Sequence, residues 1–528
     1  MSALLASRHT LLLVSVLAAA LVQGPACGGG GEGSASGATS GETSTGTSSG
    51  GESEGASTTA GGLVGTCDPP IAALAPADAR LTVDAEGRLR DAQGRDVIMR
   101  GLNTGGRSKW APFVPFPLAA DADLAATAAA ADAFFERLRP WGVDVVRMPM
   151  SWEALEPSRG TYDEGYLDRY EAMVTSAWSR GLRVIVDFHQ DIYASPFCGD
   201  GFPIWSIGQA DPGAPRHDCP GWGIKYLNDA GVRASFDRFW AGEDDLRVDF
   251  VAMWSEVLMR LGDHPGVVGF EVINEPGWGT ASDQAAWKDE VLAPFYAEAL
   301  AELRPLAPGL LFFYDDPGID AVPLADVHFT EVVGEGLVYA PHLYDPGLLA
   351  GQAASGLDPL PKLTGMATNR AAQGHAVLLG EFGLAEASLS QGGAEWLTLV
   401  LDQVDALRFS ATLWECSQAA ELWNGEDLSV LGADGEERAL LDAFVRPWLR
   451  AVAGTDASFA WDGSAGAASA SWTADGGVSE IVLPARIFGA EPQVEVSGEG
   501  ACFTYDPGRG EVRVQAPAGV AVTVTLGL

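Results

Sequence analysis

Two short motifs each place a glutamate where it could act in acid–base or nucleophilic chemistry. Glu275 lies in Ile-Asn-Glu-Pro and Glu381 lies in Leu-Gly-Glu-Phe-Gly. Each follows an apolar run of the kind that forms a buried strand. Two carboxyl groups can break a glycosidic bond when one protonates the leaving oxygen and the other attacks the sugar carbon. Either motif alone is common in surface turns, so this interpretation requires a fold that brings both to one place.

From about residue 80, the chain alternates apolar, strand-like runs with helical patterns. The runs are short and rich in Val, Ile, Leu and aromatic residues, which favours strands buried on both faces of a parallel sheet. The predicted strands are 97–103, 143–149, 183–189, 267–274, 310–315, 337–343, 376–382 and 411–415. The helical patterns between them include 121–139, 164–180, 248–261, 284–304 and 395–408. The fifth connection is short and poorly periodic. Eight such units predict an α/β fold, the (β/α)8 TIM barrel.

Polar side chains stand at the C-terminal ends of these strands, where a TIM barrel carries its active site. They are Asn103, Arg147, Asp187 with His189, Asn274 with Glu275, Asp315 with Asp316, His342 with Tyr344, Glu381, and Trp414 with Glu415. The ends of the fourth and seventh strands face each other across the barrel mouth. Glu275 and Glu381 can therefore approach to about 5 Å, the separation of a retaining pair.

The residues next to this pair have types that suit sugar chemistry. Asn274 can bind the sugar 2-hydroxyl, a contact that strengthens as charge develops. Tyr344 can touch the Glu381 carboxylate and keep it ionised. Arg147 can do the same by ion pairing, which would also fix the rotamer of Glu381.

A further set of side chains suits the remaining hydroxyls and the sugar ring itself. His189, His342 and Asp191 can bind neighbouring hydroxyls, and Trp414 offers a flat apolar platform. The alternative for His189 is a buried, hydrogen-bonded histidine without contact to substrate. The other acidic residues near strand ends are interpreted as loop or structural carboxylates: Glu153, Glu156, Asp315 and Asp316.

The segments on either side of the barrel differ from it in pattern. Residues 81–99 predict a hairpin that turns at 91–94 and covers the barrel floor. After residue 454, short alternating runs with glycine turns predict a small antiparallel β-sandwich. Its predicted strands are 469–473, 480–483, 493–496, 511–515 and 520–526. The predicted domains are thus a barrel at 67–453 and a β-sandwich at 454–528, for which a stabilising role is favoured over a binding role.

The first 66 residues predict export and anchoring. In residues 1–26, Arg8 is the one formal charge, and it precedes an apolar run at 11–22 that is typical of a signal peptide. Small residues precede Cys27, as at a bacterial lipoprotein cleavage site, so Cys27 is predicted to carry lipid; ordinary cleavage is the alternative. The segment 27–66 is predicted to be a flexible tether, because 28–62 lacks aromatic and branched aliphatic residues. The protein is expected outside the cytoplasm, held at the outer surface of a bacterial membrane or secreted.

Charge and cysteine content restrict the partners. The formal net charge is −39, so a nucleic acid partner is not expected. Outside the cytoplasm disulfides can form, and Cys198 and Cys219 flank one loop and are the predicted pair. The pairing of Cys67, Cys416 and Cys502 stays open, with at least one free thiol. Metal-ligand spacing is absent from the sequence, so neither a metal nor a cofactor is expected, and a monomer is expected.

At these residues, the sequence resembles glycoside hydrolase family 5, and within it the endoglycoceramidase branch. The segments that carry the resemblance are Arg-Gly-Leu-Asn-Thr at 100–104, Trp-Glu-Ala-Leu-Glu-Pro at 152–157, Asp-Phe-His-Gln-Asp-Ile-Tyr at 187–193, Tyr-Ala-Pro-His-Leu-Tyr at 339–344, Leu-Gly-Glu-Phe-Gly-Leu at 379–384, and Arg-Pro-Trp-Leu-Arg-Ala-Val-Ala-Gly-Thr at 446–455. The resemblance implies hydrolysis of the β-linkage between glycan and ceramide in glycosphingolipids, through a glycosyl-enzyme intermediate.

The resemblance also implies residue roles. Glu275 would be the acid/base and Glu381 the nucleophile. The first sugar subsite would be lined by Lys109, His189, Asp191, Asn274, His342, Tyr344 and Trp414. One departure is that Glu415 and Cys416 follow Trp414, where the family tends to carry small polar residues. Glu415 is expected beside the sugar subsite, where it bears on sugar preference.

Other functions stay open at this level. One is a family 5 glucanase, or a glucosidase acting on glucosylceramide or steryl glucoside. A long cleft of aromatic platforms would favour polysaccharide, whereas a groove that is polar on one side and apolar on the other would favour glycolipid. The aromatic-rich segment 192–247 could form such an apolar wall, or could simply pack on itself. From another class, a surface lipoprotein could bind glycolipid without hydrolysing it, although two intact glutamates argue against this.

Overall fold

The computed structural model describes residues 65–528 apart from 75, 120, 325–327 and 490. The predicted signal peptide, Cys27 and almost all of the predicted tether lie outside the described residues. Within the described part, none of the helices has both the length and the apolar character needed to cross a membrane.

Eight parallel strands close into a barrel in the order of the chain, and each overlaps one predicted strand. They are β4 (Arg100–Asn103), β5 (Val145–Met150), β6 (Arg183–Phe188), β7 (Val267–Glu271), β8 (Leu311–Tyr314), β9 (Leu337–Tyr339), β11 (Ala376–Leu379) and β13 (Ser410–Leu413). Every residue in them except Arg183 is buried, which explains the continuous apolar runs. The predicted TIM barrel is confirmed.

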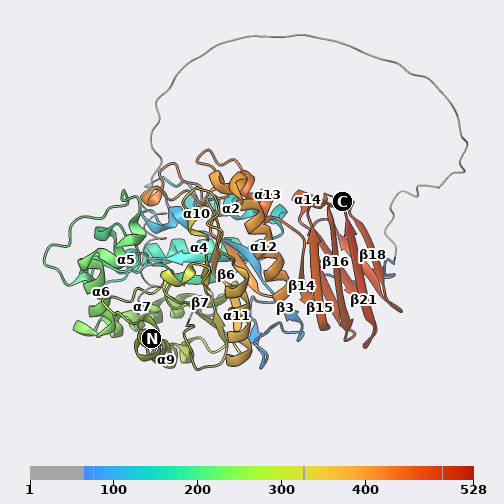
Figure 1. Cartoon of the computed structure of the whole chain (residues 1–528), viewed down its shortest axis with the longest axis horizontal. Helices are drawn as coiled ribbons and strands as arrows, with labels where there is room; N and C mark the ends of the chain where they lie inside the picture. The colour runs from blue at the N-terminus through green and yellow to red at the C-terminus, as the bar shows by residue number, and fades with distance from the viewer. Residues whose placement is uncertain (1–64, 75, 120, 325–327, 490) are drawn as a thin grey trace, which may run out of the picture.

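Helices pack around the outside of the barrel (Figure 1). The longer ones are α2 (Leu124–Glu136), α4 (Glu164–Ser179), α6 (Ala230–Trp240), α7 (Leu246–Leu261), α9 (Ala293–Leu303), α11 (Leu360–Gln373) and α12 (Gly393–Leu407). Asp123 and Asp163 cap α2 and α4 by accepting backbone N–H groups, so these helices begin close to where the pattern places them. The described part of the fifth connection contains one short 3-10 turn, η9 (Gly318–Ala321), in agreement with its weak pattern.

Two antiparallel sheets lie beside the barrel, on the right of Figure 1. One contains β15 (Gly454–Asp462), β16 (Ala467–Ala474), β21 (Ala521–Gly527) and β18 (Gln493–Ser497), in that order. The other runs β1 (Thr82–Val83), β2 (Leu89–Arg90), β3 (Asp96–Val97), β14 (Trp448–Val452), β17 (Val478–Val482), β20 (Glu511–Gln515) and β19 (Cys502–Asp506). Apolar side chains from the two sheets form one core between them, so the antiparallel sandwich is present.

The N-terminal strands β1, β2 and β3 contact both the barrel and the C-terminal sandwich. Leu81, Leu89 and Val97 pack into the lower barrel core, so the segment covers the barrel floor as predicted. The same strands extend the C-terminal sheet, because β3 pairs with β14. This shared sheet, which the pattern did not predict, joins barrel and sandwich across the predicted boundary at 453/454.

Two disulfides are present among the described cysteines. Cys198 is bonded to Cys219, as predicted, and Cys67 is bonded to Cys502 in β19. The backbone N–H of Cys67 also donates to the carbonyl of Phe503 at 2.8 Å. Cys416 is a buried free thiol. The first described residues are therefore attached to the edge of the sandwich and not to the barrel.

Candidate active site

The predicted polar strand ends meet at the C-terminal mouth of the barrel. Glu275 follows β7, and Glu381 begins the short strand β12 (Glu381–Phe382), which pairs with β10 (His342–Leu343). One carboxylate oxygen of Glu275, one of Glu381 and a ring nitrogen of His342 all lie within 4.8 Å of one another. This spacing matches the roughly 5 Å of a retaining pair and is below the roughly 6.5–9.5 Å that an inverting pair needs.

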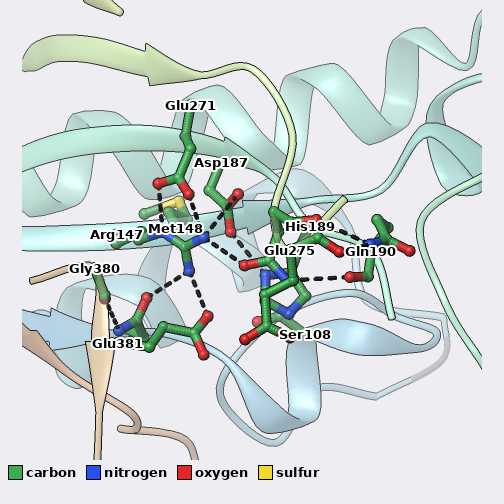
Figure 2. A network of polar contacts seen from close by, with 12 residues as sticks. Ser108, Arg147, Met148, Asp187, His189, Gln190, Glu271, Glu275, Gly380 and Glu381 are labelled. Carbon is green, nitrogen blue, oxygen red and sulfur yellow. Dashed lines mark hydrogen bonds and ion pairs between the residues drawn. The ribbon is translucent and has the colours of Figure 1, made fainter. Parts of the chain in front are cut away.

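Arg147 lies between the carboxylates of Asp187, Glu271 and Glu381 (Figure 2). Its Nη1 donates to Glu381 Oε1 at 2.7 Å, so the predicted contact between Arg147 and Glu381 is present. On the other side, its Nε and Nη2 donate to the two carboxylate oxygens of Glu271 at 2.6 and 2.8 Å. Asn103 and Asn274 accept from the same guanidinium at 2.9 and 2.7 Å. This completely buried cation therefore holds Glu381 in place from below.

The second oxygen of Glu381 faces Tyr344 and His342. Tyr344 Oη donates to Glu381 Oε2 at 2.9 Å, which is the contact predicted for Tyr344. His342 Nδ1 lies 3.5 Å from the same oxygen. Burial lowers the pKa of His342 to about 3, so its imidazole is neutral at physiological pH. Both oxygens of Glu381 are thus oriented by fixed partners.

Glu275 has a different electrostatic environment. Burial, and then the nearby charge of Asp191, raise the pKa of Glu275 to about 7. His342 Nδ1 lies 2.7 Å from Glu275 Oε1. A carboxyl with a pKa near neutrality can both hold and release a proton at working pH, which general acid–base chemistry requires.

The residues expected at the first sugar subsite form a connected group beside this pair. Lys109 Nζ donates to Asp191 Oδ2 at 2.6 Å, and His189 Nδ1 lies 2.8 Å from Asp187 Oδ2. Although burial opposes charge on His189, Asp187 and Asp191 raise its pKa to about 10. The ring of Trp414 is stacked on His189 at a centroid distance of 5.0 Å. His189 is therefore a buried, hydrogen-bonded histidine, and its ring lies against the ring of Trp414, the predicted sugar platform.

Asn274 is held at both ends of its amide. Its Oδ1 accepts from Arg147, and its Nδ2 donates to the backbone carbonyl of Gln190 at 3.1 Å. The side chain is therefore oriented before any substrate arrives.

Two acidic residues of the site were missed from the sequence, the buried Glu271 and the half-buried Glu426. Glu271 accepts two hydrogen bonds from Arg147. It is the one charged residue in the apolar run 267–273, and this pattern could have indicated a buried ion pair. Glu426 accepts from Trp414 Nε1 at 2.8 Å and lies 3.5 Å from Lys109 Nζ. It comes from an irregular loop, where no local pattern indicates its position.

Glu415 lies beside Trp414, as expected. Its side chain is buried, and Oε1 accepts from Ser417 Oγ at 3.1 Å. Burial, and then the charge of Glu426, raise its pKa to about 8. Glu415 and Glu426 both line a small pocket next to the subsite residues.

Aromatic side chains of the segment 192–247 pack into the interior of the molecule. Phe202, Tyr226 and Trp240 are buried among neighbouring aromatic rings of this segment and of α7 and α9. Trp222 instead contacts Trp423 at a centroid distance of 5.0 Å, next to Lys109. Packing of the long segment, one of the two alternatives, therefore accounts for these three buried rings.

Comparison with known proteins agrees with this geometry. The model of the cellulase family, glycosyl hydrolase family 5, matches residues 91–420. Endoglycoceramidase I of Rhodococcus hoagii is 32% identical over 216 residues, which are 39% of this chain and 39% of that protein. Glucosylceramidase of Cryptococcus neoformans is 29% identical over 250 residues, 37% of this chain and 33% of that protein. The matched region thus spans well under half the length of these relatives.

A solved structure extends the similarity over most of the chain. Endo-glycoceramidase II from Rhodococcus sp., in its lactosyl-enzyme intermediate, superposes with a TM-score of 0.67 at 26% identity. The superposition covers 84% of this chain and 99% of that one. The family model matches more than half of this chain. The chain therefore belongs to glycosyl hydrolase family 5 and is a glycoside hydrolase.

Proposed function

We propose that this glycoside hydrolase is a retaining β-glycosidase that hydrolyses the bond between glycan and ceramide in glycosphingolipids. The observation that carries the proposal is the pair Glu275 and Glu381, with carboxylate oxygens within 4.8 Å of each other at the barrel mouth. The similarity to endoglycoceramidases I and II supports the substrate class.

In the first step, Glu381 attacks the anomeric carbon of the sugar and forms a glycosyl ester. The bond from that carbon to the ceramide oxygen breaks, and Glu275 gives its proton to this oxygen. The contacts of Arg147 and Tyr344 with Glu381 support its role as nucleophile, because they fix the attacking carboxylate. The pKa of Glu275 near 7 supports its role as acid.

In the second step, Glu275 acts as the base. It takes a proton from water, whose oxygen bonds to the anomeric carbon as the ester bond to Glu381 breaks. Two inversions at the same carbon retain its configuration. Asn274 would donate to the 2-hydroxyl, a contact that strengthens in the transition state.

The group beside the pair would bind the first sugar. Lys109 and Asp191 form an ion pair whose remaining hydrogen-bonding capacity can reach sugar hydroxyls, and His189 belongs to the same group. Trp414 would contact the sugar ring, and His342 and Tyr344 would bind it between the two glutamates. The substrate would be presented at a membrane surface, to which lipid on Cys27 would hold the enzyme.

A second candidate function is removal of a single glucose from glucosylceramide. The sequence similarity to a glucosylceramidase favours it. The two functions differ in product, because one releases an intact oligosaccharide and the other releases glucose.

The deciding experiment is incubation with a ganglioside, lactosylceramide, glucosylceramide, a steryl glucoside and a cellodextrin, with products identified by mass. We expect intact oligosaccharide and ceramide from the ganglioside and from lactosylceramide. The variant Glu381→Gln serves as the control for contaminating activity. Release of glucose from glucosylceramide alone would replace the proposal with the second candidate, and turnover of the cellodextrin alone would replace it with a glucanase.

A further inference from the structure

The backbone of Glu275 has an unusual conformation. Its φ is +38°, in the left-handed region, which is unfavourable for a residue with a side chain. Pro276 follows, and the residue before a proline has fewer accessible backbone conformations, so the backbone of Glu275 is restricted further. Such a conformation persists only where the surrounding structure enforces it. The contacts that enforce it therefore determine where the Glu275 carboxyl points.

Gln190 holds this peptide from one side. Its Nε2 donates to the backbone carbonyl of Asn274 at 2.9 Å and to that of Glu275 at 2.7 Å. Figure 2 shows Gln190 reaching toward this part of the chain. A single amide thus binds the carbonyls on both sides of the Glu275 backbone, and the side chain of Gln190 is completely buried.

Gln190 is itself fixed by the segment that follows β6. Its Oε1 accepts from the N–H of Tyr193 at 3.1 Å, and its Nε2 also lies 3.2 Å from Tyr226 Oη. Tyr226 Oη accepts in turn from the N–H of Ile192 at 3.0 Å. The amide of Gln190 therefore has one orientation, with its donor directed at the Glu275 peptide.

Asp315 holds the same peptide from the other side. Its Oδ2 accepts from the N–H of Glu275 at 3.1 Å. The backbone of Asp315 is fixed by Tyr296, whose Oη donates to its carbonyl at 2.8 Å. Asp315 is interpreted from the sequence as a structural carboxylate. Its carboxylate directly contacts the backbone N–H of Glu275, the candidate acid.

The nucleophile is held by a separate set of contacts. Glu381 is oriented by Arg147 and Tyr344, as described above, and neither Gln190 nor Asp315 is among its hydrogen-bond partners in the described residues. Loss of the contacts to the Glu275 peptide would therefore remove none of the hydrogen bonds that Glu381 itself makes.

We propose that Gln190 and Asp315 are positioning residues for the acid/base, because they hold the Glu275 peptide in the conformation that directs its carboxyl toward His342 and Glu381. The inference rests on the proposed role of Glu275 as acid. Without these contacts, Glu275 relaxes toward extended backbone and its carboxyl moves away from the leaving oxygen. Proton donation then fails while nucleophilic attack continues.

The test uses aryl β-glycosides whose leaving groups differ in their need for a proton. Phenoxide needs protonation, whereas 2,4-dinitrophenoxide leaves unaided. For Gln190→Met, we expect kcat/KM to fall roughly tenfold to a hundredfold with the phenyl glycoside, and less than about threefold with the dinitrophenyl glycoside; general acid catalysis is worth about 10²–10⁴ in rate. Azide should raise kcat of this variant on the dinitrophenyl substrate, because it attacks the glycosyl ester without a base.

The matched control is Gln373→Met on α11. The amide of Gln373 likewise accepts from a backbone N–H, that of Val332 at 3.2 Å, but lies on the outer helices. It should leave both substrates within about twofold of the wild type, as changes at separate sites act independently. The two oxygens of Asp315 accept from the N–H groups of Glu275 and Asp316. Asp315→Ala removes both acceptors and should reproduce the leaving-group dependence of Gln190→Met, whereas Asp315→Asn keeps one acceptor and should lose less on the phenyl glycoside.

Equal losses of Gln190→Met on both substrates, or no loss, would overturn the inference. If Gln190→Met fails to fold by circular dichroism, the comparison of Asp315→Asn with Asp315→Ala decides in the same way. Glu275→Gln belongs in the same assay. If Glu275→Gln lacks the leaving-group dependence, the proposed function fails; if it shows the dependence and the positioning variants do not, only this inference fails.

Discussion

Tyr344 donates its hydroxyl to Oε2 of Glu381 at 2.9 Å, while the other carboxylate oxygen is held by Arg147. The carboxylate that we propose as the nucleophile is therefore oriented from two directions, by a neutral donor and by a cation. Among the described residues, Glu275 has hydrogen bonds to neither Tyr344 nor Arg147; His342 Nδ1 lies 2.7 Å from its Oε1, and burial and the charge of Asp191 raise its pKa to about 7. Two glutamates of one barrel are thus prepared for opposite tasks.

Tyr344→Phe removes the neutral donor without changing the shape of the side chain. We expect kcat to fall roughly tenfold to a hundredfold, since a hydrogen bond to a charged group contributes about 1.5–3 kcal/mol. The melting temperature should change little. Tyr505→Phe is the matched control, because the Tyr505 hydroxyl donates to Gly489 on the sandwich at 3.0 Å. Equal effects of the two variants on kcat would contradict the assigned contact.

Glu381→Gln replaces the nucleophile by an amide of the same size. We expect turnover to fall by at least about 10⁴-fold, because the glycosyl ester cannot form. Circular dichroism and the melting curve should remain close to wild type, since Arg147 keeps both contacts to Glu271. Near-native activity of purified Glu381→Gln would refute the mechanism.

The pKa of Glu275 predicts the alkaline limb of the pH profile. The acid must be protonated to act, so kcat/KM on a phenyl glycoside should decline as pH rises through about 7. The dinitrophenyl glycoside needs no proton and should show a weaker decline. Initial rates between pH 4 and 9 give both curves. Identical alkaline limbs would assign the ionisation to another group.

Glu415 should make the stability depend on pH. Burial raises its pKa from the ordinary 4.5 to about 8, so the folded protein binds this proton more tightly than the unfolded chain. Its contribution is complete below about pH 4.5 and is lost as pH rises through about 8. Glu415→Gln should therefore raise the melting temperature at pH 9 relative to wild type and change it little at pH 5. Glu436→Gln, at an exposed position of the same loop, should change neither.

The lipid anchor is tested by labelling. Cells expressing the protein should incorporate radioactive palmitate into it, and mass spectrometry should place the lipid on Cys27. Cys27→Ser should abolish the label and release the enzyme into soluble fractions without altering kcat on an aryl glycoside. A mature N-terminus elsewhere in the wild type would exclude the anchor.

The barrel was predictable because its strands are buried on both faces and therefore leave unbroken apolar runs. β15 was missed because most of its residues are exposed or half-buried, so its pattern resembles that of a loop. β19, in which one residue of five is buried, was missed as well. The pairing of β3 with β14 joins segments far apart in sequence, and no local pattern encodes such a contact.

The same distinction applies to the site. Tyr344 and the two glutamates stand at or just after strand ends, and Arg147 lies within the neighbouring strand β5, so topology brings them together. Glu426 reaches Lys109 from an irregular loop, and its position depends on contacts such as the one with Trp414. The role of Gln190 depends on the backbone conformation of Glu275, which no residue type specifies.

The bond between Cys67 and Cys502 would have a mechanical consequence if lipid on Cys27 held the enzyme by its N-terminus, as proposed. A pull on Cys67 would then reach the sandwich at β19 through this covalent link. The force then spreads across the sheet that continues through β14 to β3, below the barrel. In a tethered enzyme, force from the membrane would therefore act on the sandwich, at the end of the barrel opposite the mouth that carries Glu275 and Glu381.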